Sequence, residues 1–158
     1  IREEVMEYSI NPQAEQDSIE AFLKAQYPHI PIIPDGVPDT ENELIQHFPN
    51  SRIKPFMILW YSTVKRRPRG RSFGGYKLDS HFASLDILIV TSDPTVARTL
   101  MNDVSDRLVG FRTEGGGRLY KSPSLWGQAR SVDMQTKPTR WAMTDRFDFG
   151  VASKKVAP

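Results

Sequence analysis

The sequence predicts an α+β fold, with a mostly antiparallel sheet that contains a long β-hairpin and two main helices packed on one face. Three observations predict it: two long apolar strand patterns joined by a basic loop, two amphipathic helix patterns, and an alternating strand pattern near the C-terminus. The strands are not separated by regular crossover helices, which favours α+β over α/β. With 158 residues, the chain 1–158 is expected to be a single domain with its core over about 12–152.

The first helix is expected over 12–26. Asn11 can cap it, and Pro12 suits the first helical position. Ile19, Phe22 and Leu23 share one face of this helix and should pack on the sheet.

The segment after this helix is rich in proline, so at most a short edge strand is expected, at Ile32 and Ile33. A turn at 34–36 follows. A capping box of Thr40 with Glu43 opens a possible two-turn helix through Phe48.

The long hairpin is predicted from strands at 55–64 and 78–91. The first is so uniformly apolar that both of its faces should be buried in the centre of the sheet. The second places Leu85, Ile87 and Ile89 on one face. Between the strands, residues 65–77 should form a flexible loop that contains three glycines, no acidic residue and six cations. These cations are the candidate contacts to a partner protein or to DNA: Lys65, Arg66, Arg67, Arg69, Arg71 and Lys77.

The second helix is the clearest one, over about 94–110, with Asp93 as its cap and Pro94 as its first residue. Its stripe toward the sheet is expected to consist of Val96, Leu100, Met101, Val104 and Leu108.

Three strands are expected in the remainder of the chain: a short one at 118–121, a weak one at 128–134 and a long one at 139–151. In the last, aromatic and aliphatic residues alternate with polar ones, and Asp145 interrupts the apolar face. We expect Asp145 at an end of the core or in a subunit contact. The tail 153–158 should be frayed.

The net charge of +2 conceals two oppositely charged halves. Residues 1–64 hold four basic and ten acidic residues, a net of −6, whereas 65–158 hold seventeen basic and nine acidic residues, a net of +8. Such a split suggests surfaces of opposite sign, which could meet another protein, a nucleic acid or a second copy of the chain.

Catalytic patterns are weak. There is no cysteine, which excludes thiolate nucleophiles and cysteine metal sites. Asp79, His81 and Asp86 are the nearest approach to a nuclease site, but Asp86 should point to the other face of its strand. We therefore expect a protein that is not an enzyme, with no cofactor and no metal site. The apolar runs are also too short to cross a membrane.

The order of elements, with several short stretches, resembles the tail terminator (tail completion) proteins of long-tailed bacteriophages (siphoviruses), particularly those of actinobacteria. The resemblance covers about 17–153 and includes the basic loop and the strand after it. The stretches that carry it are Asp17 to Ile19, the turn Asp35-Gly36-Val37-Pro38, the strand 55–59, the helix segment 97–104, and Trp141 with Asp145, Arg146 and Phe147. The segment 40–54 is longer than expected for the family.

This resemblance implies a structural protein of the virion, assembled in the host cytoplasm. Its copies would form a ring, typically a homohexamer, that caps the tail tube and joins it to the head-closure or connector proteins of the neck. The ring would leave a channel for genomic DNA. Head-closure and tube proteins share parts of this architecture and remain alternatives, as does a small nucleic-acid-binding protein or nuclease that uses the basic loop.

Overall fold

The computed structural model describes residues 12–35, 46, 48–50, 52–67, 80–114, 117–122, 130–133 and 140–151. Within these residues the chain forms two helices and one seven-stranded sheet. All strand pairs are antiparallel except one, so the α+β class is confirmed.

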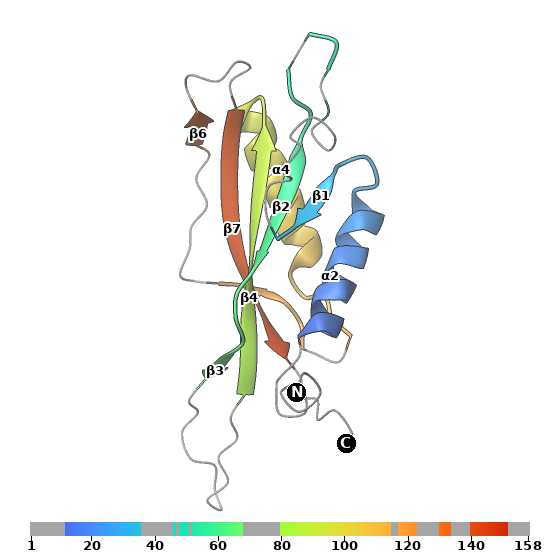
Figure 1. Cartoon of the computed structure of the whole chain (residues 1–158), viewed down its shortest axis with the longest axis vertical. Coiled ribbons are helices and arrows are strands. Elements are labelled where there is room, and N and C mark those ends of the chain that lie inside the picture. Colours follow the sequence, from blue (N-terminus) through green and yellow to red (C-terminus); the bar gives the residue numbers. More distant parts are fainter. Residues whose placement is uncertain are drawn as a thin grey trace, which may run out of the picture.

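The main path of the sheet has the order β1-β2-β4-β7-β5, while β3 pairs with β4 and β6 pairs with β7 (Figure 1). Strands β4 and β7 are the longest, and they pair along almost their whole length at the centre. The exception to antiparallel pairing is the short edge strand β1, which runs parallel to β2. The bounds are β1 Ile32–Pro34, β2 Phe56–Tyr61, β3 Lys65–Arg67, β4 Ser80–Thr91, β5 Tyr120–Lys121, β6 Arg130–Asp133 and β7 Arg140–Val151.

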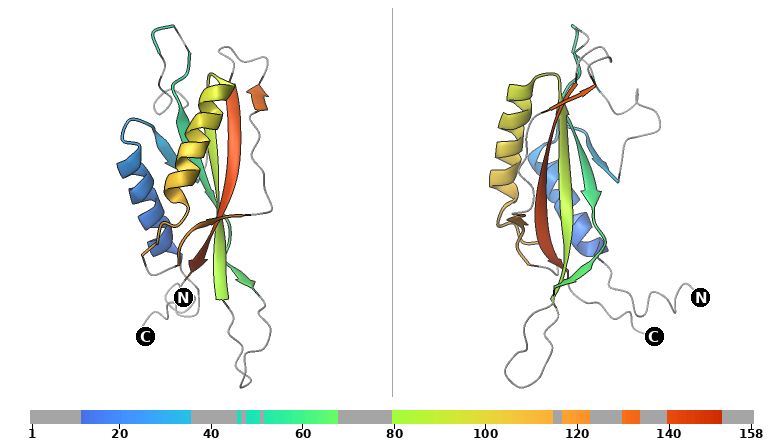
Figure 2. Two further views of the ribbon diagram at one scale, coloured as in Figure 1. Left: turned by 180° about the vertical axis from the view of Figure 1, so that it is seen from behind. Right: turned by 90° about the vertical axis from the view of Figure 1, so that its left-hand side faces the viewer.

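Helix α4 (Pro94–Leu108) begins as the sequence predicts. The Asp93 side chain accepts a hydrogen bond from the Thr95 amide at 2.7 Å, and Pro94 takes the first turn. The predicted stripe toward the sheet is wrong only at its first position, because Val96 is 42% exposed and Ala97 is buried in its place, while Leu100 packs against the core. The other residues that bury this face are Met101, Val104 and Leu108. Figure 2 shows α4 lying along the sheet.

Helix α2 (Gln13–Gln26) starts one residue later than expected. Pro12 is the N-cap and makes no side-chain capping bond, and Asn11 lies outside the described residues. Ile19 and Leu23 are fully buried, as predicted. Phe22 stacks on Phe111 with ring centroids 4.2 Å apart, which ties α2 to the segment after α4.

Both helices contribute to the core on one face of the sheet. Ile19 and Leu23 of α2 and Met101 of α4 belong to the same buried cluster as Leu85 and Phe147 of the central strands. The two helices are also joined at their surface, because the Tyr27 hydroxyl donates to Asp103 at 2.6 Å. The predicted packing of two helices on one face is thus confirmed.

A smaller cluster covers part of the opposite face. Ile58, Val90 and Ala142 share this face by register, and Ile53 packs on them. The remainder of the face, toward β3, is lined by polar side chains and forms the surface considered below.

Two predictions of local structure are wrong within the described residues. The predicted helix over 40–48 does not include Gln46 and Phe48. Their backbone groups bond to later residues instead, as in a turn: the Lys54 amide donates to the Gln46 carbonyl, and the Phe48 amide donates to the Arg52 carbonyl. The loop over 65–77 begins as a strand, since β3 pairs with β4.

Asp145 lies inside the core, 2% exposed, and the Lys121 ammonium lies 3.2 Å from its carboxylate. The tail 153–158 lies outside the described residues.

Candidate interaction surface

The six cations predicted as contact residues fall into two groups. Lys65, Arg66 and Arg67 form β3, which lies toward one end of the long axis of the molecule (Figure 1), and the Lys65 side chain is exposed. Arg69, Arg71 and Lys77 lie outside the described residues. The structure therefore places the first three residues of the predicted basic loop on the sheet itself.

A β-bulge separates β2 from β3. Tyr61 is opposite Leu85, but Lys65 is opposite Phe82, so three residues on this side face two residues of β4. The Ser62 side chain fills the irregular ladder: its hydroxyl accepts from the Ser84 amide at 2.8 Å and donates to the Thr63 carbonyl at 2.9 Å. The extra residue changes which face the following side chains occupy.

Because of this bulge, Lys65 lies on the same face as Trp60. Trp60 is opposite Asp86 and Lys65 is opposite Phe82, and positions 82 and 86 of β4 share a face. In an uninterrupted strand, residues five apart would point to opposite faces. The bulge therefore brings an exposed lysine beside an exposed tryptophan.

Trp60 is 46% exposed, although the uniformly apolar run predicts burial on both faces of β2. Its neighbours across the sheet are polar: Asp86 on β4 and, beyond it, Arg146 on β7. We call the surface formed by Trp60, Lys65, Asp86 and Arg146, together with the buried Ser84 and Asp148 beneath it, the Trp60 face. No helix of the described residues packs on it, since both helices pack on the other side of the sheet.

The polar groups of the Trp60 face are held in fixed pairs. Arg146 binds Asp86 through two contacts, Nε to Oδ1 at 2.6 Å and Nη2 to Oδ2 at 3.0 Å. The hydrogen bond and the charge of Asp86 raise the pKa of the Arg146 guanidinium. Ser84 donates to Asp148 at 2.6 Å, and both side chains are buried. These pairs fix the positions of the polar side chains next to Trp60.

A small hollow of about 160 Å³ lies on the Trp60 face. Its size suits one side chain of a partner. Across β7, the 39% exposed Tyr120 is opposite Asp148 and therefore lies on the same face. The hollow is lined by Trp60, Tyr61, Ser62, Lys65, Ser84, Asp86 and Arg146.

A group of carboxylates lies on the other side of β2, next to α2. The Tyr61 hydroxyl donates to Glu20 at 3.3 Å, and Asp17 and Asp35 are close enough to act on the same hydroxyl. Burial, followed by the negative charges of Glu20, Asp35 and Asp17, raises the pKa of Tyr61. We call Asp17, Glu20 and Asp35 the α2 acidic group. The adjacent residues Trp60 and Tyr61 thus point to surfaces of different charge.

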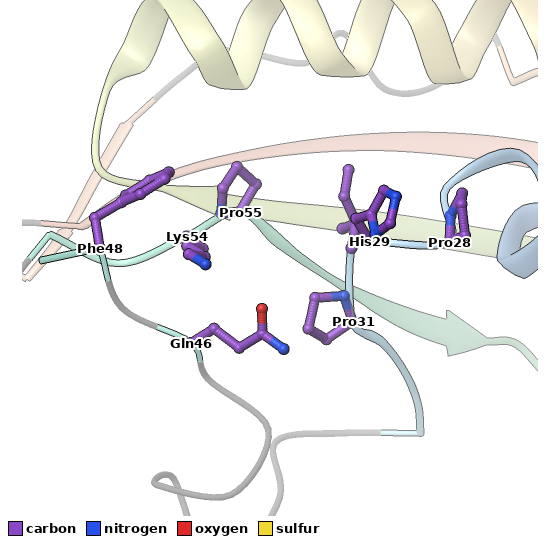
Figure 3. A pocket seen from close by; sticks show the side chains of 8 residues that line it. Pro28, His29, Pro31, Gln46, Phe48, Lys54 and Pro55 are labelled. Atoms are coloured by element: carbon purple, nitrogen blue, oxygen red, sulfur yellow. The ribbon is translucent and has the colours of Figure 1, made fainter.

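A second hollow, of about 620 Å³, lies between the segments 28–31 and 46–55 (Figure 3). Pro31 and Gln46 face each other across it, and Phe48 and Lys54 lie at one end, where the Lys54 ammonium is 5.4 Å from the centre of the Phe48 ring. Prolines contribute much of the lining. The polar side chains in the lining are His29, Gln46 and Lys54.

The carboxylate and histidine positions considered for a nuclease are separated as predicted. His81 is opposite Val151 and Asp86 is opposite Arg146, on different faces of β4, while Asp79 lies outside the described residues. In the described part of the chain, no group of three His, Asp or Glu side chains could hold a metal ion. In the same part, no helix is both long and apolar enough to span a bilayer.

Comparison with known proteins found no protein-family model that matches the chain and no curated protein with significant similarity to it.

Proposed function

We propose that the chain is a structural virion protein that assembles as a ring, caps a phage tail tube and joins it to the neck of the particle. The Trp60 face carries this proposal. A tryptophan that is 46% exposed, surrounded by paired charged groups, is typical of a protein interface, where tryptophan and arginine are enriched and a polar rim surrounds the apolar centre.

The fold also supports the proposal. The resemblance to tail terminator proteins implies an α+β subunit, and the chain has this class with both helices on one face of the sheet. The part of the other face around the exposed Trp60 is then available for contacts to neighbouring copies, to the tube or to the connector protein.

Two surfaces that differ in charge support a ring rather than a symmetric pair. The Trp60 face carries Lys65 next to further basic residues of β3, and the α2 acidic group lies on the other side of β2. A contact between two different surfaces is heterologous, and it forms a closed ring when the rotation between copies closes.

The oligomeric mass in solution tests this proposal. A hexamer of 18.0 kDa chains would have a mass of about 108 kDa (six times 18.0) and should persist on dilution to micromolar chain concentration. Cosedimentation with purified tail tubes should be saturable at a small, fixed number of chains per tube, because only tube ends are bound. A monomer at all concentrations that does not cosediment would contradict the proposal.

A second candidate, nucleic-acid binding, is favoured by the exposed Lys65 and the adjacent basic residues of β3. In a ring, these residues would line the channel and contact passing DNA. Such contacts involve phosphates, so affinity for duplex DNA should fall steeply with salt and should not depend on sequence. A fluorescence titration at two salt concentrations distinguishes this function from protein contacts alone.

A further inference from the structure

The Trp60 side chain leaves a large apolar surface exposed on an otherwise polar face. Its neighbours in register, Asp86 and Arg146, are engaged with each other through two short contacts. Polar groups already satisfied in this way can be covered by a partner at a lower desolvation cost than unpaired ones. The surface is therefore suited to burial in a complex.

The bulge at 62–64 adds a cation to this surface. It places Lys65 on the face of Trp60, where both line the same hollow of about 160 Å³. Bulges next to functional sites commonly re-aim a side chain in this way. The two side chains together would bind a partner that offers an apolar contact and a carboxylate.

The chain itself carries a surface of this chemistry. Asp17 and Asp35 of the α2 acidic group are exposed, and Ala21, one turn further along α2 than Asp17, is an exposed apolar side chain. In the same copy, this surface lies across β2 from Trp60 and cannot reach it, because Trp60 and Tyr61 point to opposite faces. It is accessible to the Trp60 face of another copy.

We propose that the Trp60 face of one copy binds the α2 acidic group of a second copy, with Lys65 opposite Asp17. This inference rests on the proposed ring, because it names the two surfaces that would join neighbouring subunits. The two surfaces differ, so the contact is heterologous, and an open row of copies retains one free surface of each kind, at its two ends, until the ring closes.

Charge on the Trp60 face favours this occupant over nucleic acid. The partly exposed carboxylate of Asp86 shares the face with Lys65 and Arg146, so phosphates would meet an anion beside the cations. A protein surface with one or two carboxylates can place them against Lys65 and avoid Asp86. The α2 acidic group meets that requirement.

Single substitutions in the full chain test the contact. Trp60→Ala and Lys65→Glu should each weaken self-association at least about tenfold, as expected for a central tryptophan and a reversed charge. Matched controls on α4 are Val96→Ala, another exposed apolar side chain, and Arg98→Glu, another exposed cation. The controls should assemble as the unaltered chain does, and circular dichroism should show that all four variants are folded.

A charge swap identifies the surface of the second copy. Adding Asp17→Lys to Lys65→Glu should restore most of the lost association, because the pair is re-formed with reversed signs. Adding Asp106→Lys instead, which makes the same charge change on the exposed side of α4, should not restore association. Association is measured by sedimentation velocity over a range of chain concentrations.

The outcomes separate this inference from the proposed function. If the unaltered chain forms rings and the Trp60 and Lys65 variants form them equally well, the ring stands and this contact is wrong. Failure of Asp17→Lys to restore a Lys65→Glu assembly also overturns the pairing. If both variants assemble but lose affinity for DNA, the Trp60 face is a nucleic-acid site instead. A chain that remains monomeric under all conditions contradicts both proposals.

Discussion

Arg146 on β7 and Asp86 on β4 lie directly opposite each other and form a two-point ion pair, with contacts of 2.6 and 3.0 Å. The pair joins the two longest strands on the face that carries Trp60. Its side chains are 36% and 28% exposed, so solvent weakens the attraction but does not abolish it. The pair therefore links β4 to β7 and also forms part of the Trp60 face.

Arg146→Lys should destabilise the fold by about 1 kcal/mol, because a lysine ammonium cannot reproduce the two parallel contacts to Asp86. Urea unfolding measures the free energy. The control is Arg98→Lys, on the exposed side of α4, which should change the free energy of unfolding by less than about 0.5 kcal/mol. Equal stability of the two variants would mean that the Asp86 contact contributes nothing measurable.

Phe147→Ala should cost about 3–5 kcal/mol, since Phe147 is fully buried between β4 and the helices and its removal leaves a cavity. Val109→Ala is the matched control, because Val109 is 46% exposed. Both are measured by urea unfolding. A loss below about 1 kcal/mol for Phe147→Ala would contradict the described core.

The bulge provides a prediction that involves no charge change. Deleting Thr63 removes the extra residue between β2 and β3, so Lys65 then follows Trp60 by four positions and should keep its place opposite Phe82 on the Trp60 face. We expect a folded protein whose self-association equals that of the unaltered chain. Ser62→Ala keeps the extra residue and should cost only about 1 kcal/mol of stability from its lost hydrogen bonds. Self-association that falls after the deletion as much as after Lys65→Glu would show that the bulge itself, and not only the side on which Lys65 lies, is needed for the contact.

Acid should weaken the link between α2 and α4. Hydrogen bonds from Tyr27 and Arg107 hold the pKa of Asp103 below its usual value of about 3.9. The ionised carboxylate therefore stabilises the fold at neutral pH, and this contribution is lost as the pH falls below about 4 and through the lowered pKa.

Asp103→Asn tests this link. Because Asp103 is 44% exposed, the variant should be less stable than the unaltered chain by only about 0.5–1 kcal/mol at pH 7, and the difference should shrink at pH 3. Thermal unfolding at the two pH values measures it, with Asp106→Asn, exposed on the same helix, as the control. A difference that is independent of pH would contradict the assignment to the Asp103 charge.

Local signals in the sequence were sufficient for much of the fold. Asp93 followed by Pro94 marks the start of α4, since a capping carboxylate and a fixed proline φ act within one turn. The alternation that ends in Phe147, Phe149 and Val151 identifies β7 because one face of that strand is buried.

The Trp60 face could not be predicted in the same way. An apolar run from Phe56 to Tyr61 does not reveal that β2 extends past the end of the smaller core cluster, which leaves Trp60 exposed. The position of Lys65 depends on a bulge that exists only in the pairing with β4, a long-range property. The polar residues Ser84, Asp86, Arg146 and Asp148 alternate in the sequence, and that pattern could have indicated a polar sheet face once the register was known.

Electron microscopy of purified tail tubes mixed with the protein tests the central proposal most directly. The proposal predicts closed rings of the free protein and additional density of the same diameter at one end of each tube, with an open channel through its centre. The Lys65→Glu variant should show neither at the same concentration, while Arg98→Glu should show both. Tubes with bare ends, in a solution of unaltered protein that forms no rings, would contradict it.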